Sequence, residues 1–387
     1  MSGPVFDVAI IGGGTAGCAA ALALRQRAMS VVLLEKGACG AMASGTNFGG
    51  VRRQGRDFRE MPLATRSRAI WDRLPAIVGE DCEFRATGHV KLARDDAEMA
   101  ELERYAREAR DHGLELSVVG GNAVRALYPW LGPKVVGASL CADDGQANPR
   151  LVAPAYARAA RAAGAEIREF AKVEGARWTG SFFEVEAGPA SARARRLVNV
   201  AGLWGGEVAG WFGEGVPIRP LCPNMVVTEP LPYFIDRSIG VCGGNVYARQ
   251  VERGNVIFGG GRGWGDARAG LSRPRAEVAR DAMARALEIL PQLRDARIIR
   301  TWTGFDGEMP DEIPVIGPSL STPGLVHAFG FSGHGFQLGP AMGEIVAELV
   351  ADGRTPSPVE PFSIGRFTSA PPAPRLTCSH DQGRLTT

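Results

Sequence analysis

Short runs of hydrophobic residues alternate along the chain with segments in which apolar positions recur every three or four residues. The first run, residues 6–11, has the length of a buried parallel strand and breaks at three glycines. An alanine-rich helical pattern follows over residues 15–27, and a second apolar strand, 31–34, ends at Glu35. Strand, glycine turn, helix, strand and acid in this order predict a dinucleotide-binding βαβ unit.

Each part of this unit has a mechanical role in holding a dinucleotide. Gly12 allows the tight turn, Gly14 lets the backbone approach a pyrophosphate, and Gly17 lets the helix pack closely on the strand. The helix N-terminus offers free N–H groups and a partial positive charge to the phosphates. Glu35 is placed to accept hydrogen bonds from a ribose diol, and its charge would repel a 2′-phosphate.

The rest of the pattern predicts a mixed protein in which helices and strands alternate. Further helices are expected at 57–79, 95–112, 122–131 with Asn122 as its N-cap, 151–163, 274–290 and 340–351. Strands are expected at 83–93, 166–170, 182–186, 196–200, 297–305 and 325–328, and antiparallel strands at 238–242, 246–250 and 256–260. Residues 366–387, rich in proline, serine and threonine, are expected to form a disordered tail.

Two more glycine-rich junctions between a strand and a helix occur at residues 199–206 and 330–337. Each offers free N–H groups at a helix start, as the first junction does. Three such junctions at the start, middle and end of one chain indicate a long ligand with several polar parts, and FAD is such a ligand. The loop over residues 37–54, rich in small residues, leaves the second strand where open α/β sheets bind ligands.

Composition narrows the class of protein without identifying it. A length of 387 residues predicts two interleaved domains, and a formal net charge of +2 without a long basic run gives no reason to expect nucleic acid. No apolar stretch reaches about 18 residues, so no membrane span is predicted. Seven scattered cysteines without CxxC pairs favour free thiols in a reducing cytoplasm, and neither cysteines nor histidines show metal-ligand spacing.

The chain resembles the flavin-dependent amino-acid oxidoreductases of the D-amino-acid oxidase superfamily, above all glycine oxidase and sarcosine oxidase. The resemblance spans roughly residues 5–352, and it rests on residues 12–17 with Glu35 and on segments 44–53, 199–204, 310–317 and 330–337. It implies an α/β (α+β) fold: a glutathione-reductase-like FAD-binding domain interleaved with a substrate domain built on a mostly antiparallel sheet. The expected FAD domain comprises 1–80, 142–215 and 300–365, and the substrate domain 81–141 and 216–299.

The resemblance also implies which residues meet the substrate. Arg52 matches an arginine that binds the substrate carboxylate in sarcosine oxidases, a role that suits bidentate guanidinium geometry. Gln337 stands where those enzymes carry a lysine ligand to the same carboxylate, and Tyr247 resembles the active-site tyrosine of glycine oxidases. Segment 304–306, Gly-Phe-Asp, stands where glycine oxidases read Gly-Leu-Arg, so that arginine is absent. Arg249 or Arg262 could supply the missing charge.

FAD is expected to be bound noncovalently, because none of the seven cysteines falls near Gly304, where the covalent-flavin cysteine of monomeric sarcosine oxidases would lie. His334 is expected to be a turn residue against the flavin rather than a general base. The expected cofactor-binding residues are Gly12, Gly14, Thr15, Ala16, Gly17, Glu35, Lys36, Ser44, Gly45, Thr46, Asn47, Gly50, Val173, Ala201, Gly202, Trp204, Gly304, Gly330, Phe331, Gly333, His334, Gly335, Phe336 and Gln337.

The resemblance implies oxidation of the C–N bond of an amino acid, with a glycine-type secondary amine as the expected substrate. Hydride transfer to flavin N5 would give an imine that hydrolyses, and O2 or another acceptor would reoxidise the flavin. Two alternatives remain open: a 2-hydroxy acid or glycerol-3-phosphate type of dehydrogenase, and a flavoprotein subunit of a multi-subunit dehydrogenase. The expected partners are a small-molecule substrate and the electron acceptor, and the sequence leaves open whether the chain forms a homo-oligomer.

Overall fold

An eight-stranded mixed sheet is built around the first apolar run of the sequence. The computed structural model describes residues 4–367 and 377–378 of the chain. Along the sheet lie β21 (Val315–Pro318), β22 (Leu325–Phe329), β11 (Ala192–Asn199), β1 (Val5–Ile11), β2 (Val31–Leu34) and β8 (Glu166–Arg168), with β10 (Phe183–Glu186) and β9 (Gly175–Trp178) attached beside β11. The strands from β22 to β8 are parallel, whereas β21, β10 and β9 join antiparallel.

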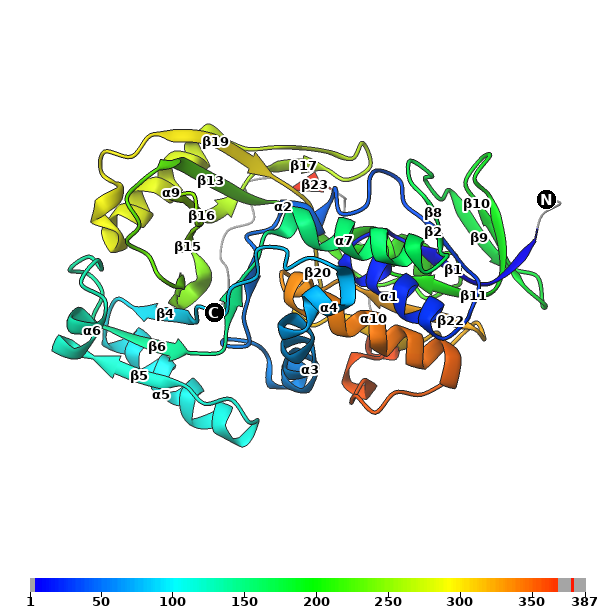
Figure 1. Cartoon of the computed structure of the whole chain (residues 1–387), viewed down its shortest axis with the longest axis horizontal. Coiled ribbons are helices and arrows are strands. Elements are labelled where there is room, and N and C mark those ends of the chain that lie inside the picture. Colours follow the sequence, from blue (N-terminus) through cyan, green and yellow to red (C-terminus); the bar gives the residue numbers. More distant parts are fainter. Residues whose placement is uncertain (1–3, 368–376, 379–387) are drawn as a thin grey trace.

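Both faces of this sheet are covered, which is why its central strands are apolar throughout. One face packs against α1 (Thr15–Gln26), α7 (Pro149–Ala162) and α10 (Gly335–Asp352), as Figure 1 shows. The alanines of α1 let it lie close to both α7 and α10. The other face is covered by β9, β10 and α8 (Gly205–Gly210), so the carboxyl ends of the parallel strands are left as the open edge.

A second eight-stranded sheet forms the other end of the molecule (Figure 1). Its strand order is β19 (Ile298–Thr303), β13 (Pro223–Pro230), β16 (Asn255–Arg262), β15 (Tyr247–Gln250), β14 (Ser238–Val241), β4 (His89–Ala93), β6 (Gly137–Cys141) and β5 (Ser117–Gly120). All neighbours are antiparallel except β14 and β4. One face buries α9 (Ala276–Ile289), which leaves the alternate side chains of β15 for the opposite face.

Smaller elements connect the two sheets. Three small sheets pair β12 (Arg219–Leu221) with β20 (Asp306–Glu308), β17 (Trp264–Asp266) with both β18 (Leu271–Arg273) and β23 (Thr377–Cys378), and β3 (Gly50–Val51) with β7 (Gly145–Gln146). The remaining helices are α2 (Ala43–Thr46), α3 (Met61–Asp72), α4 (Leu74–Val78), α5 (Asp96–Asp111) and α6 (Gly121–Leu127). Single 3-10 turns are η1 (Phe58–Glu60), η2 (Gly202–Trp204), η3 (Cys242–Gly244), η4 (Pro291–Leu293), η5 (Glu360–Phe362) and η6 (Ile364–Phe367).

Several helix starts differ from the sequence-based expectation. Gly120, not Asn122, caps α6, so the asparagine lies inside the helix. Helix α7 starts two residues earlier than expected because Asn148 accepts a hydrogen bond from the Arg150 N–H and acts as its N-cap. Helix α10 begins at Gly335 and carries Pro340 in its interior, although proline is more usual in a first turn.

The C-terminal end and the strands expected at 83–93, with a turn at 87–88, are shorter than expected. After this turn His89–Ala93 forms a strand, while before it Arg85 makes only an isolated bridge. Of the expected disordered tail, 366–367 belong to η6 and 377–378 to β23, and the rest lies outside the described residues. The division into two domains stays a prediction. Within the described residues, no helix is long and apolar enough to cross a bilayer.

Candidate active site

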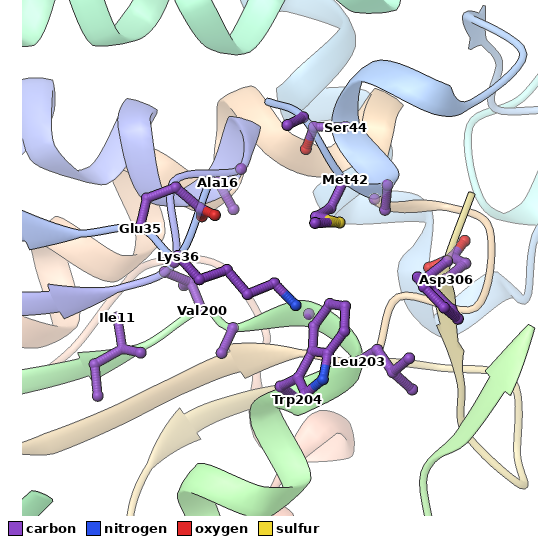
Figure 2. Close-up of a pocket in the computed structure, with 18 of the residues that line it drawn as sticks. Ile11, Ala16, Glu35, Lys36, Met42, Ser44, Val200, Leu203, Trp204 and Asp306 are labelled. Carbon is purple, nitrogen blue, oxygen red and sulfur yellow. The ribbon is translucent and has the colours of Figure 1, made fainter. Parts of the chain in front are cut away.

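A cavity of about 470 Å³ opens where β1, β2 and β11 end. This is the edge at which open α/β sheets bind ligands, and the volume is typical of small-molecule sites. Figure 2 shows the cavity running from Ile11 and Glu35 at one end to Asp306 at the other. The expected cofactor residues that line it are Gly12, Gly14, Thr15, Ala16, Glu35, Lys36, Ser44, Asn47, Val173, Ala201, Gly202, Trp204, Phe331, Gly333, Gly335 and Phe336.

The N-terminus of α1 forms one wall of the cavity. Gly14 is the N-cap residue, and because it has no side chain it cannot cap the helix with one. The Thr15 N–H donates instead to Ser44 Oγ at 2.9 Å. At Gly17 a Cβ atom would lie 1.9 Å from the Gly12 carbonyl oxygen, so only glycine allows this close approach of helix and turn. The wall therefore presents backbone N–H groups and the positive end of the helix dipole to the cavity, an arrangement that suits a phosphate.

Glu35 marks the end of the cavity beyond this helix. Its Oε2 accepts from the Gly13 N–H at 2.7 Å and its Oε1 from the Gly37 N–H at 2.8 Å. These two hydrogen bonds fix the carboxylate, and the residue is buried, with 8% of its surface exposed. Each carboxylate oxygen can accept a further hydrogen bond. The side chain can therefore bind a pair of hydroxyl groups, as the sequence predicts for a ribose.

The end of the Lys36 side chain lies over the Trp204 ring in the middle of the cavity (Figure 2). The lysine Nζ lies 2.7 Å from the centroid of the indole ring, and burial lowers the lysine pKa to about 8. The indole is fixed by a hydrogen bond of 3.1 Å from its Nε1 to the Ala267 carbonyl oxygen. This cation–π pair places a positive charge and an aromatic ring together in the lining of the cavity.

The far end of the cavity is formed by β20 and the turn before α10. The turn is tied to the strand because the Ser332 N–H donates to the Gly307 carbonyl at 2.9 Å, and the Met309 N–H donates to Ser332 Oγ at 3.0 Å. Asp306 Oδ1 accepts from the Gly307 N–H at 2.8 Å. Burial raises the pKa of Asp306 to about 6, so a carboxylate without a cationic partner among the described residues faces this end.

Behind the turn, His334 packs against a buried acid. Its Nδ1 lies 2.7 Å from Glu60 Oε2, and Glu60 is fully buried with Arg56 at 3.8 Å. Burial lowers the pKa of His334, while the neighbouring Glu60 acts in the opposite direction. His334 does not line the cavity. Its side chain lies behind the turn on Glu60, whereas the sequence-based expectation placed it against the flavin.

Residues 7–349 match the family described as DAO, FAD dependent oxidoreductase. The chain belongs to this family. An opine oxidase subunit of Rhizobium meliloti is 29% identical over 377 residues, which cover 93% of this chain and 97% of that protein. The glycine oxidase of Geobacillus kaustophilus (strain HTA426) is 27% identical over 373 residues, which cover 93% and 97%. The structure of L-proline dehydrogenase from P. horikoshii superposes with a TM-score of 0.86 at 28% identity, covering 95% of this chain and 98% of that one.

The cavity fits the FAD of a DAO-family enzyme. The N-terminus of α1 suits the pyrophosphate, and Glu35 suits a ribose. The turn before α10 lies at the opposite end, where its backbone N–H groups can meet the polar edge of the flavin. Among the described residues, none of those that line the cavity is a cysteine.

The expected cofactor residues outside the lining support it from behind. Thr46 accepts through its carbonyl oxygen a hydrogen bond of 2.8 Å from Trp302 Nε1, and Gly304 packs so closely on Thr46 that a Cβ there would lie 2.0 Å from its Oγ1. Gln337 is buried and donates from Nε2 to the Ala64 carbonyl at 2.8 Å, so it packs against α3. The others outside the lining are Gly17, Gly45, Gly50, Gly330 and His334.

Two of the expected substrate residues, Tyr247 and Arg249, contact the loop that follows α2, and a third, Arg52, belongs to that loop. The rings of Phe48 and Tyr247 contact edge to face with centroids 4.9 Å apart, and Arg249 Nε donates to the Phe48 carbonyl at 2.7 Å. Burial raises the pKa of Tyr247 and lowers that of Arg249 to about 10. Arg52, from the same loop, donates from NH1 to the carbonyl oxygens of Gln54 and Gly55.

Arg249 also lines a second cavity, of about 340 Å³, on the loop-facing side of the antiparallel sheet. This cavity shares Asn47 with the FAD cavity. Arg262, the alternative source of positive charge, is already paired with Glu308 at 3.2 Å. Among the described residues, no group of three or more acidic, histidine or cysteine side chains could hold a metal ion.

Sequence reasoning missed part of the cavity lining. Phe305 and Asp306 directly follow Gly304, so their place beside an expected cofactor residue was a usable signal. The segment 267–270 carries no such signal, because it reaches the cavity only through the pairing of β17 with β18. Glu207 and Trp211 line the cavity from α8 and the residue that follows it.

Proposed function

We propose that this chain oxidises the C–N bond of an amino acid whose nitrogen carries a second substituent: an N-substituted glycine, a sarcosine-like compound, an opine or an imino acid. The relatives support this class, because the substrates in the names opine oxidase, glycine oxidase and L-proline dehydrogenase all carry an amine next to a carboxylate. Bound FAD supplies the acceptor for the hydride that leaves the carbon beside the nitrogen.

One observation carries the substrate assignment. Arg52 belongs to the loop beside the FAD cavity, and Arg249 is hydrogen-bonded to Phe48 of the same loop. Neither guanidinium group forms an ion pair within the described residues. Arg249 is 5% exposed, so its charge is held in a poorly hydrated place. A cation in such surroundings favours an anionic ligand, and a substrate carboxylate provides one.

The residues of this chain then act mainly by positioning. Arg52 and Tyr247 hold the carboxylate, and Phe48 gives the substrate an apolar wall through its contact with Tyr247. A substrate held in this way presents its C–H bond at a fixed distance and angle, which lowers the entropic cost of the reaction. The imine product hydrolyses in water without a further catalytic group.

The first experiment is anaerobic reduction of the purified holoprotein with a substrate panel. Glycine, sarcosine, longer N-alkyl and N-carboxyalkyl glycines, D- and L-proline, opines and 2-hydroxy acids are mixed with it, and loss of the flavin absorbance is recorded. Bleaching by secondary amines is expected. Bleaching by 2-hydroxy acids alone would overturn the assignment and favour the alternative dehydrogenase class.

Admission of air to the bleached protein tests the electron acceptor. We propose O2 as the acceptor, with H2O2 as its product, so the colour should return within the mixing experiment. The opine oxidase relative is named as one subunit of its enzyme, which supports the alternative of a chain that passes electrons on through partner subunits. A flavin that stays reduced in air would favour that alternative or another acceptor.

Arg52→Gln and Arg249→Gln test the carboxylate site with the substrate found in the panel. Each is expected to raise KM by about 10- to 100-fold, the usual loss when one charge-assisted hydrogen bond is removed. Arg262→Gln is the matched control, because that guanidinium is paired with Glu308. Equal effects of all three substitutions would contradict the proposed site.

A further inference from the structure

Asp306 is an acidic side chain with no assigned task at the flavin end of the cavity. It lies at the start of β20, and Figure 2 shows it at the end opposite Glu35. Of the other two acids that line the cavity, Glu35 at the opposite end has both oxygens engaged by backbone N–H groups, and Glu207 lies on α8 at an exposed position. Asp306 accepts a hydrogen bond from the Gly307 N–H and forms no ion pair among the described residues.

The segment just before Asp306 packs near the loop that carries Arg52. Strand β19 ends at Thr303, and the next residue, Gly304, packs directly on Thr46, the last residue of α2, which this loop follows. Trp302 is hydrogen-bonded to the same residue. Asp306 therefore lies at the junction between the antiparallel sheet and the turn before α10, where it lines the cavity and is partly buried.

The charges around this position are uneven. Glu308, on the same side of β20, is paired with Arg262 at 3.2 Å and adds negative potential at Asp306. His334 points away to Glu60 and Arg56 behind the turn. Only the N–H groups of Gly307 and Gly333 stabilise the ionised form of Asp306. No cationic side chain among the described residues forms an ion pair with this carboxylate. A ligand with a positive charge would therefore be a favourable partner for it.

Resting on the proposed function, we propose that Asp306 binds the positively charged nitrogen of the substrate and makes the enzyme selective for amines. Asp306 is then the anionic group for the substrate nitrogen, while Arg52 keeps its proposed role toward the substrate carboxylate. A hydroxyl group in place of the ammonium can donate a hydrogen bond to Asp306 but brings no positive charge, so it compensates the carboxylate less well.

The test measures binding of two compounds that have no amine lone pair and therefore cannot be oxidised at a C–N bond in the proposed way. Trimethylglycine carries a carboxylate and a permanent positive charge, and acetate carries the carboxylate alone. Each is titrated into the FAD holoprotein and into Asp306→Asn, and the perturbation of the flavin spectrum gives Kd. The asparagine oxygen can keep the hydrogen bond from Gly307, so the fold and the FAD content should be retained.

In the substituted protein, trimethylglycine is expected to bind about 10- to 100-fold more weakly, while acetate binds equally well or better. In the unsubstituted protein, trimethylglycine affinity should fall below a pH of about 6, where Asp306 becomes neutral. An unchanged affinity ratio in the substituted protein overturns the inference, whatever the panel shows. Bleaching by hydroxy acids alone overturns the proposed function, so the two failures are distinguishable. If the substitution lowers FAD content, the pH titration still decides.

Discussion

A buried chain of hydrogen bonds beneath the second glycine junction allows a quantitative prediction. His327 is fully buried, its Nε2 lies 3.1 Å from Glu214 Oε2, and its Nδ1 lies 3.1 Å from Asn199 Nδ2. The Asn199 oxygen accepts from the Ala201 N–H, so the amide nitrogen of Asn199 must donate to His327 Nδ1. His327 Nε2 then carries the hydrogen atom and donates a hydrogen bond to Glu214 Oε2. Glu214 accepts this bond best when its carboxylate is ionised.

The pKa of Glu214 sets the size of the effect. Burial opposes its ionisation, but hydrogen bonds from His327, from Ser319 Oγ at 2.6 Å and from the Leu320 N–H at 2.6 Å outweigh this and lower the pKa from 4.5 to about 2. Because one pKa unit corresponds to about 1.36 kcal/mol, ionised Glu214 stabilises the fold by about 3 kcal/mol. A lowered pKa gives stability that is complete above 4.5 and is lost as the pH falls towards 2.

Glu214→Gln is therefore expected to lower the free energy of unfolding by about 3 kcal/mol at pH 7. The difference between the two proteins should shrink by about 2 kcal/mol at pH 3, where the unfolded-state carboxyl is protonated. Urea unfolding followed by circular dichroism at both pH values measures this. Glu174→Gln, at an exposed position, is the control. A difference between Glu214→Gln and the original protein that is the same at pH 7 and pH 3 would refute the reasoning.

Three further substitutions test other contacts. Gly17→Ala should weaken FAD binding by about 10- to 100-fold in a fluorescence titration, because its Cβ would meet the Gly12 carbonyl, whereas Gly210→Ala meets no atom within 4 Å and should bind normally. Arg66→Met removes ion pairs of 2.7 Å to both Glu344 and Glu348 and should cost about 1 kcal/mol in urea unfolding at low salt, less at high salt. Tyr247→Phe should change stability by less than about 0.5 kcal/mol, because among the described residues the hydroxyl contacts only Met225 Sδ, at 3.7 Å. It should raise KM for the substrate in steady-state assays, and an unchanged KM would exclude the hydroxyl from substrate binding.

The sequence predicted the FAD cavity well where the signal is local. The turn at Gly12, the helix that starts at Thr15 and the acid at Glu35 lie within one short stretch, and each has a steric or electrostatic requirement that few residues meet. The helix boundaries were less predictable, as Pro340 shows. A proline in the helix interior is disfavoured locally, but close packing of α10 against α1 favours the longer helix.

The substrate side could not be predicted to the same depth, because its contacts join distant segments. The alternation of β15 places Tyr247 and Arg249 on one face, which the sequence does predict. It does not reveal that Phe48, 201 residues before Arg249, lies against that face and accepts its hydrogen bond. Asp306 shows the same limit from the opposite direction. The sequence marks it as a departure from the arginine of glycine oxidases, but only the packing of Gly304 on Thr46 and of Gly307 on Ser332 places its carboxylate in the cavity. A substitution that reverses the charge of a side chain therefore has a functional meaning only once the groups facing that side chain are known.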